Sequence, residues 1–287
     1  MTERVLLIGC GDLGLRVAQR FLARGDEVHA LRRNPPAGGP EGLHWLRGDI
    51  SRPDGLPSLP RGVTRLIHLP APGAREAGAY RGVFVDGLAN VLDALDASRL
   101  ERVVFVSSSA VYGEHHGDWV NEDTPPAPLG MNGRLLLEAE AALAARKLPS
   151  TALRLAGLYG PGRLQLIERL RNGLAGAPVR PEHWANRMHI DDAAAAVAHL
   201  ALIPEAAPAY IGCDDTPLPL HTLYAELARL AGAPAPRVAP APPNVGSKKL
   251  SNARLRATGF TPQWPDSRSG YAALLAEAAG QDDHPQA

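Results

Sequence analysis

The chain has 287 residues, enough for one large α/β domain with an appended lobe. Its 30 Lys and Arg residues balance 30 Asp and Glu residues, so nucleic acid and membrane surfaces are not expected as partners. No charged leader with an apolar segment opens the sequence, and no stretch reaches the roughly 20 apolar residues of a membrane span. Two cysteines, Cys10 and Cys213, are too few for a disulfide framework or a metal cluster. We therefore expect a globular cytoplasmic protein without a metal site.

The first patterned stretch is an apolar run over residues 4–8 that leads into the spacing G-x-G-x-x-G over residues 9–14. Apolar residues at helical spacing then predict a helix over residues 13–22. A strand, a glycine turn and a helix together hold a dinucleotide, because the glycines admit the pyrophosphate and the helix start attracts its charge. A plain strand-to-helix turn is the alternative. The predicted cofactor contacts in this turn are Gly9, Gly11, Asp12, Leu13 and Gly14.

A second predicted strand, residues 26–31, ends in Arg32 and Arg33. A unit that binds NAD carries an acidic residue at about this place, roughly 20 residues beyond the glycines, to hold the ribose 2′-hydroxyl. A guanidinium group instead suits a 2′-phosphate, because it is planar, permanently charged and bidentate. We predict NADP(H) in preference to NAD(H). The alternative is that both arginines are solvated at a strand end.

Four further strands are predicted at residues 43–50, 64–69, 102–106 and 150–155. Helices are predicted at residues 79–97 and 132–147, with a long polar loop over residues 114–130. Alternating strands and helices predict a doubly wound parallel sheet, whose ligands bind at the carboxyl ends of the strands. Further cofactor contacts are therefore predicted at strand ends, namely Asp49, Ile50, Leu69, Pro70, Ala71 and Ser107.

The second half of the chain is less regular. Predicted elements are helices at residues 164–174, 191–202 and 271–278, a strand at 209–211 and an Ala/Pro-rich linker at 231–243. We predict a dinucleotide-binding domain over residues 1–158, to which 187–214 return. Residues 159–186 and 215–280 would form a smaller mixed α/β lobe on the substrate side, and 281–287 a disordered tail.

Three motifs resemble landmarks of the extended short-chain dehydrogenase/reductase superfamily, often called NAD-dependent epimerases/dehydratases. They are Ser107–Gly113, the stretch from Leu153 to Gly162, and Met188–Asp192. The resemblance covers about the whole chain, although this family usually spaces its glycines G-x-x-G-x-x-G. It implies a Rossmann-like fold and a substrate that is small and polar, such as a nucleotide-linked sugar. Dimerisation through helices at 79–97 and 132–147 is common in relatives, so a homodimer is also expected.

Active members of that family use a Ser or Thr, a Tyr, and a Lys four residues after the Tyr. Ser108, four residues before Tyr112, matches the Ser/Thr position, but the chain contains no Tyr-x-x-x-Lys pair. Aligning the helix over residues 132–147 with the family places Asn132 at the Tyr position and Leu136 at the Lys position. Neither side chain can replace the acid-base function of that pair. Ser108 and Tyr112 are therefore the candidate catalytic residues of an atypical member.

Three functions remain open. The chain is an NAD(P)-dependent oxidoreductase or epimerase with displaced catalytic groups, a non-catalytic NADP(H)-binding sensor or regulator, or a structural module of a complex. The predicted residues of a substrate pocket are Ser109, Tyr159, Arg163 and His189.

Overall fold

A computed structural model describes residues 2–282 of the chain. The chain folds into two compact units: residues 1–111, 130–154 and 194–210 form the first, and 112–129, 155–193 and 211–287 the second. The predicted domain boundaries differ mainly at residues 112–129, which group with the second unit because a short strand there pairs with residues 249–250. Among the described residues, no helix is long and apolar enough to cross a membrane.

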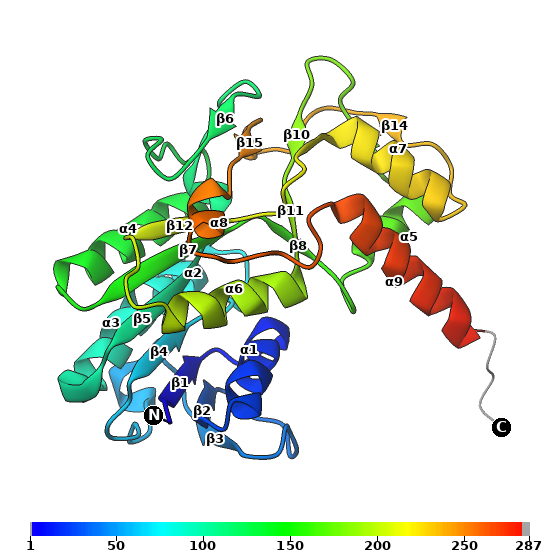
Figure 1. Ribbon diagram of the computed structural model, residues 1–287. Helices are drawn as coiled ribbons and strands as arrows, with labels where there is room; N and C mark the ends of the chain where they lie inside the picture. Colours follow the sequence, from blue (N-terminus) through cyan, green and yellow to red (C-terminus); the bar gives the residue numbers. More distant parts are fainter. Residues whose placement is uncertain (1, 283–287) are drawn as a thin grey trace. The chain divides into compact units, whose positions relative to one another are not determined.

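A seven-stranded parallel sheet, in the order β12-β7-β5-β4-β1-β2-β3, organises the first unit. The sheet confirms the predicted doubly wound α/β fold (Figure 1). Strand order reverses between β1 and β4, and the carboxyl ends of strands on either side of such a reversal form a ligand-binding crevice. The strands are β1 (Arg4–Ile8), β2 (Glu27–Arg32), β3 (Leu43–Arg47), β4 (Arg65–His68), β5 (Arg102–Ser108), β7 (Ser150–Leu155) and β12 (Ala209–Gly212).

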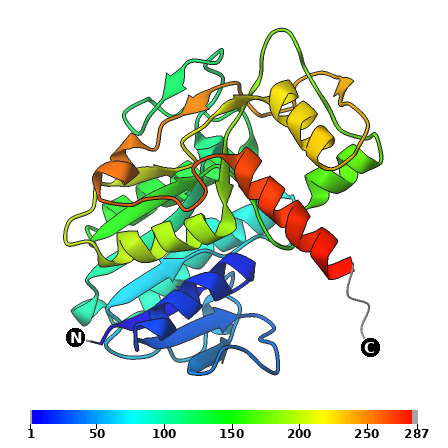
Figure 2. The same cartoon turned by 45° about the vertical axis from the view of Figure 1, so that its right-hand side comes forward.

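Helices cover both faces of this sheet. The helices α1 and α6 lie on one face in both views, whereas α2, α3 and α4 pack together on the other (Figure 2). Their bounds are α1 (Asp12–Ala23), α2 (Ala77–Phe84), α3 (Asp86–Ala94), α4 (Met131–Ala145) and α6 (Ile190–Leu202). The prediction of one helix over residues 79–97 is wrong, because the chain breaks at Val85. Gly87 there packs closely on the carbonyl oxygen of Gly82, and a Cβ at Gly87 would lie 2.8 Å from that atom.

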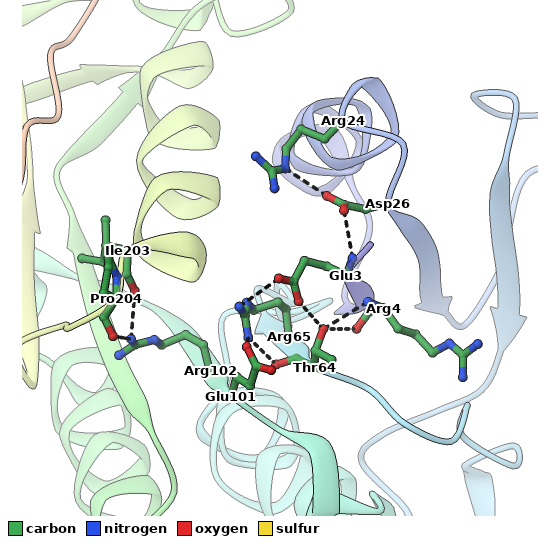
Figure 3. Close-up of polar contacts among 10 residues, drawn as sticks. All are labelled: Glu3, Arg4, Arg24, Asp26, Thr64, Arg65, Glu101, Arg102, Ile203 and Pro204. Atoms are coloured by element: carbon green, nitrogen blue, oxygen red, sulfur yellow. Dashed lines mark hydrogen bonds and ion pairs between the residues drawn. The ribbon is translucent and has the colours of Figure 1, made fainter. Parts of the chain in front are cut away.

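Polar side chains join the strands at their amino ends (Figure 3). Arg65 is buried and donates hydrogen bonds to Glu3 at 3.0 Å and Glu101 at 2.6 Å. Arg102, also buried, donates to the carbonyl oxygens of Ile203 and Pro204, which follow α6. These contacts satisfy charged groups at the edge of the sheet away from the glycine turn, so the carboxyl edge alone carries the predicted site.

The second unit has its own apolar core, to which helices α5, α7 and α9 contribute. Tyr159, Leu223 and Tyr271 are among its buried residues. The helices are α5 (Gln165–Arg171), α7 (Leu220–Leu230), α8 (Ala253–Ala257) and α9 (Ser267–Asp282). The short strands are β6 (Trp119–Val120), β8 (Gly157–Tyr159), β9 (Gly176–Ala177), β10 (Trp184–Ala185), β11 (Arg187–His189), β13 (Leu218–Pro219), β14 (Arg237–Val238) and β15 (Lys249–Leu250).

Three expectations change in this unit. The polar loop over 114–130 contains β6, which pairs with β15, and the Ala/Pro-rich stretch contains β14, which pairs with β9. Strands of two residues leave no periodic pattern in the sequence, so they could not be predicted from it. The prediction of a tail from residue 281 is wrong at its start, because α9 continues to Asp282. The rest of that predicted tail, residues 283–287, lies outside the described part of the chain.

Candidate functional site

The glycine turn lies at the carboxyl end of β1, beside the turn that follows β4. Gly9 has a φ of +89°, and a Cβ there would lie 2.3 Å from the Cα of Pro70, so only glycine fits. A Cβ on Gly14 would lie 2.8 Å from the carbonyl oxygen of Gly9, which explains the close packing of α1 on β1. The Cβ position of Gly11 has no neighbour within 4 Å. Gly11 therefore leaves a cradle over which a pyrophosphate fits.

Helix α1 begins directly at this cradle, with Gly11 as its N-cap and no side chain capping it. The first N–H groups of a helix have no partner inside the helix, and the dipole makes this end attractive to anions. The Asp12 carboxylate accepts a hydrogen bond from Arg16 Nε at 3.0 Å, one turn further along the helix. The backbone of the turn thus has the arrangement that suits a phosphate group.

Two guanidinium groups border the turn at the end of β2. Arg32 Nη1 lies 3.5 Å from the carbonyl oxygen of Cys10, inside the glycine turn. Arg33 reaches toward the segment after β4, where its Nη2 lies 3.2 Å from the position of a Cβ on Gly73. Both side chains are exposed. Positive charge is therefore concentrated where the 2′-position of an adenosine ribose lies in proteins of this fold.

The remaining predicted cofactor contacts lie at the ends of neighbouring strands. The Asp49 carboxylate accepts hydrogen bonds from the backbone and hydroxyl of Ser51, which lower the pKa of Asp49, and Arg33 lowers it further. Ile50 is buried and its carbonyl oxygen accepts a hydrogen bond from the Asn90 amide. Leu69, after β4, donates its backbone N–H to the carbonyl oxygen of Ile8 at 2.9 Å. Pro70 lies against Gly9, whereas Ala71 is exposed.

A buried ion pair fixes the serine at the end of β5. Ser107 donates its hydroxyl to Glu140 at 2.6 Å, and the same carboxylate accepts two hydrogen bonds from Arg154 at 2.6 and 3.2 Å. The two charged side chains are 11% and 9% exposed. This Ser107–Glu140–Arg154 network joins β5, α4 and β7, and the sequence analysis did not predict it. Its one signal in the sequence is that Glu140 lies four residues after Leu136, on the same face of a helix.

The candidate catalytic positions differ in exposure. The Ser108 hydroxyl is partly exposed and accepts a hydrogen bond from the Ala110 backbone at 3.2 Å. Asn132, near the start of α4, is partly exposed, whereas Leu136 is only 3% exposed and belongs to the core. Tyr112 belongs to the second unit and is 2% exposed. Ser108 thus presents a hydroxyl, whereas the Tyr112 side chain is enclosed by protein.

Two predicted pocket residues are buried in the second unit. Tyr159 is fully buried, stacks on Tyr271 with ring centroids 4.4 Å apart, and meets His189 edge to face at 5.1 Å. Burial, with a smaller contribution from the Asp214 carboxylate, raises the pKa of Tyr159. The structure thus brings Tyr159 and His189 together. Arg163 in this unit and Ser109 in the first are both partly exposed.

Known proteins with the same organisation carry this geometry further. The model of the NAD-dependent epimerase/dehydratase family matches residues 5–210. The chain is 30% identical to the protein YeeZ of Escherichia coli K12, over 92% of this chain and 97% of YeeZ. A solved structure from Methylobacillus flagellatus, whose description assigns it to the NAD-dependent epimerases/dehydratases, is 40% identical with a TM-score of 0.79, over 97% of this chain and 100% of the other. MoeE5, solved with UDP-glucose and NAD, is 25% identical with a TM-score of 0.80, over 97% and 99%.

Proposed function

This chain belongs to the NAD-dependent epimerase/dehydratase family, and we propose that it binds NADP(H) in preference to NAD(H) at its glycine turn. The observation that carries the proposal is the position of Arg32, with its guanidinium against the Cys10 carbonyl inside the turn. Arg33 supplies a second charge beside the same turn. A 2′-phosphate would gain charge-assisted hydrogen bonds there, whereas the 2′-hydroxyl of NAD(H) would meet no acidic acceptor at the end of β2.

The protein's own part is to hold and orient this group. The cradle over Gly11 and the start of α1 would take the pyrophosphate, and Pro70 and Ala71 would line the crevice between β1 and β4. Ser107, fixed by Glu140, would line the end of β5. Bound NADP(H) supplies a hydride donor or acceptor. These residues supply binding and position rather than proton transfer.

We further propose an oxidoreductase or epimerase that acts on a nucleotide-sugar-like substrate with Ser108 and Tyr112 in place of the usual dyad. MoeE5, with its UDP-glucose and NAD, supports this substrate class. The partly exposed Ser108 hydroxyl can donate a hydrogen bond to a substrate oxygen. Ser109, Tyr159, Arg163 and His189 stay proposed as residues of the substrate pocket.

A second candidate function is a non-catalytic NADP(H)-binding regulator. The burial of Leu136, at the position where the resemblance places a catalytic lysine, favours it. A homodimer through α2, α3 and α4 and a cytoplasmic location also stay proposals. Sedimentation equilibrium of the purified chain and fractionation of the source cells test them.

The test of cofactor preference is a titration of the wild type and of R32A, R33A and the double variant with NADPH and with NADH. Loss of one charge-assisted contact costs about 1.5–3 kcal/mol, or roughly 10- to 100-fold in Kd. We expect each single variant to weaken NADPH binding by that factor and to leave NADH binding nearly unchanged. R99A, which removes an exposed arginine before β5, is the matched control. Equal weakening of both cofactors would contradict the proposal.

Catalysis is tested separately, by following NADPH oxidation and sugar epimerisation with a panel of UDP-sugars, aldehydes and ketones. An enzyme turns over at least one of them, and S108A lowers kcat without changing the Kd for NADPH. Cofactor binding with no turnover on the whole panel would instead support the regulator.

A further inference from the structure

A small two-stranded ribbon in the second unit has one face outside the core. In this ribbon β6 and β15 run parallel, with Trp119 opposite Lys249 and Val120 opposite Leu250. Val120 and Leu250 are 0% and 1% exposed, so they form the inner face. Side chains alternate along a strand, and Trp119 and Lys249 therefore share the outer face. Trp119 is 59% exposed, a large apolar surface for a residue outside the proposed cofactor site.

The outer face continues one step beyond both strands. Ser251 donates its backbone N–H to the carbonyl oxygen of Val120 at 2.9 Å, which extends the ladder. A hollow of about 280 Å³ opens here, lined by Trp119, Val120, Asn121 and Ser251. We call the four residues Trp119, Asn121, Lys249 and Ser251 the Trp119 platform. The hollow falls at the lower end of the volumes of small-molecule sites, so it fits a ligand of one ring.

Lys249 brings a positive charge to this platform. Its ammonium lies 5.4 Å from the ring centroid of Trp119 and 4.9 Å from that of Trp184, over the indole faces. Within residues 2–282, no carboxylate lies within ion-pair distance of it. The two rings hold the ammonium in place without neutralising it. A negatively charged ligand group can therefore form an ion pair there without displacing an internal carboxylate.

The other polar groups of the platform are hydrogen-bond donors. Asn121 Oδ1 accepts hydrogen bonds from the backbones of Asp123 and Thr124 and from the Thr124 hydroxyl, which fixes the amide. In the described part of the chain its Nδ2 group has no partner. The Ser251 hydroxyl oxygen accepts from Ala253 and keeps its own proton to donate. The platform thus combines an exposed ring face with amide, hydroxyl and ammonium donors.

We propose that the Trp119 platform binds a sugar acid, a pyranose ring that carries a carboxylate. The exposed indole covers the C–H face of the ring and removes apolar surface from water. Asn121 and Ser251 donate to ring hydroxyl groups, and Lys249 pairs with the carboxylate. The platform presents one free aromatic face and several donors, a set that suits a ring with many oxygen acceptors better than a nucleobase. The site is separate from the residues proposed to hold the cofactor.

The test is calorimetric titration of the full chain with D-glucuronate, D-glucose and adenosine. We expect saturable binding of glucuronate, binding of glucose that is about 10-fold weaker, and no binding of adenosine that depends on Trp119. W119A should abolish glucuronate binding, and K249M should reduce it to the level of glucose. L174A, which removes another exposed apolar side chain, is the matched control.

Each variant is also titrated with NADPH, because the proposed cofactor site uses none of these residues. Unchanged NADPH affinity shows that W119A and K249M are folded, which assigns any loss of glucuronate binding to the platform. The proposal is overturned if glucuronate does not saturate, if W119A and K249M bind it like the wild type, or if adenosine displaces it.

Discussion

Gly9 and Gly11 are two residues apart, yet the structure restricts them for different reasons. Gly9 needs a positive φ and the space occupied by Pro70, so its constraint lies within the folded chain. Gly11 has an ordinary φ of −84° and open space at its Cβ position, so nothing in the protein requires glycine there. The space over Gly11 is available to a ligand.

We therefore expect G11A and G9A to separate binding from stability. G11A places a methyl group in the cradle, and it should weaken NADPH binding more than 10-fold while leaving the urea midpoint within error. G9A strains the backbone and collides with Pro70, and it should lower the free energy of unfolding by about 2 kcal/mol or more. Fluorescence titration and urea unfolding measure the two effects. Unimpaired NADPH binding by folded G11A would remove the pyrophosphate from this turn.

Asp214 is a buried carboxyl that lies against the start of α9. It is 3% exposed and accepts backbone hydrogen bonds from Thr216 at 3.3 Å and Ser267 at 3.1 Å. Burial raises the pKa of Asp214 to about 7 in spite of these bonds. A carboxyl whose folded pKa exceeds its unfolded value of about 4 stabilises the fold while protonated. Its contribution is complete below pH 4 and is lost as the pH rises through 7.

The free energy lost in D214N should accordingly be largest near pH 4 and shrink as the pH rises to 8, because only the wild type gains the penalised charge. Urea unfolding of both proteins across this range measures the difference. D54N is the control, since the exposed Asp54 has its pKa lowered by Arg52 and its contribution has the opposite sign. A difference that is constant or grows with pH would show that Asp214 is ionised throughout.

At the scale of elements, α4 shows what a helical pattern predicts and what it omits. The apolar spacing placed this helix within one or two residues of its observed bounds, Met131–Ala145. It did not show that Glu140 would meet Ser107 and Arg154, because those residues come from other strands. The short strands β6 and β15 likewise depend on each other, since each has two residues and its partner lies in a distant part of the chain.

The Ser107–Glu140–Arg154 network should be costly to break and cheap to replace. R154M leaves the buried Glu140 carboxylate without its counter-charge, and we expect a loss of about 3–5 kcal/mol in the free energy of unfolding. The double variant R154M/E140M removes both charges and should recover most of that loss. R52A, in the exposed Arg52–Asp54 pair, should leave stability nearly unchanged, because water screens that pair. Urea unfolding compares the four proteins, and a double variant no better than R154M would contradict this account.

At the scale of the whole molecule, the balance of 30 basic and 30 acidic residues leaves local charge to decide recognition. In the first unit the arginines after β2 border the glycine turn, whereas Arg65 and Arg102 are bonded internally at the opposite ends of the strands. In the second unit Lys249 lies against two indole rings. Similar side chains therefore have different roles, which composition alone does not distinguish.

The sequence by itself determined the family, the doubly wound sheet and the glycine turn, because these depend on local periodicity and on glycine spacing within a few residues. Only the tertiary structure decided which side chains meet. It brought Arg32 to Cys10, buried Tyr159 and His189 against each other, and placed Trp119 beside Lys249. Contacts of this kind join residues far apart in the chain, and no local pattern specifies them.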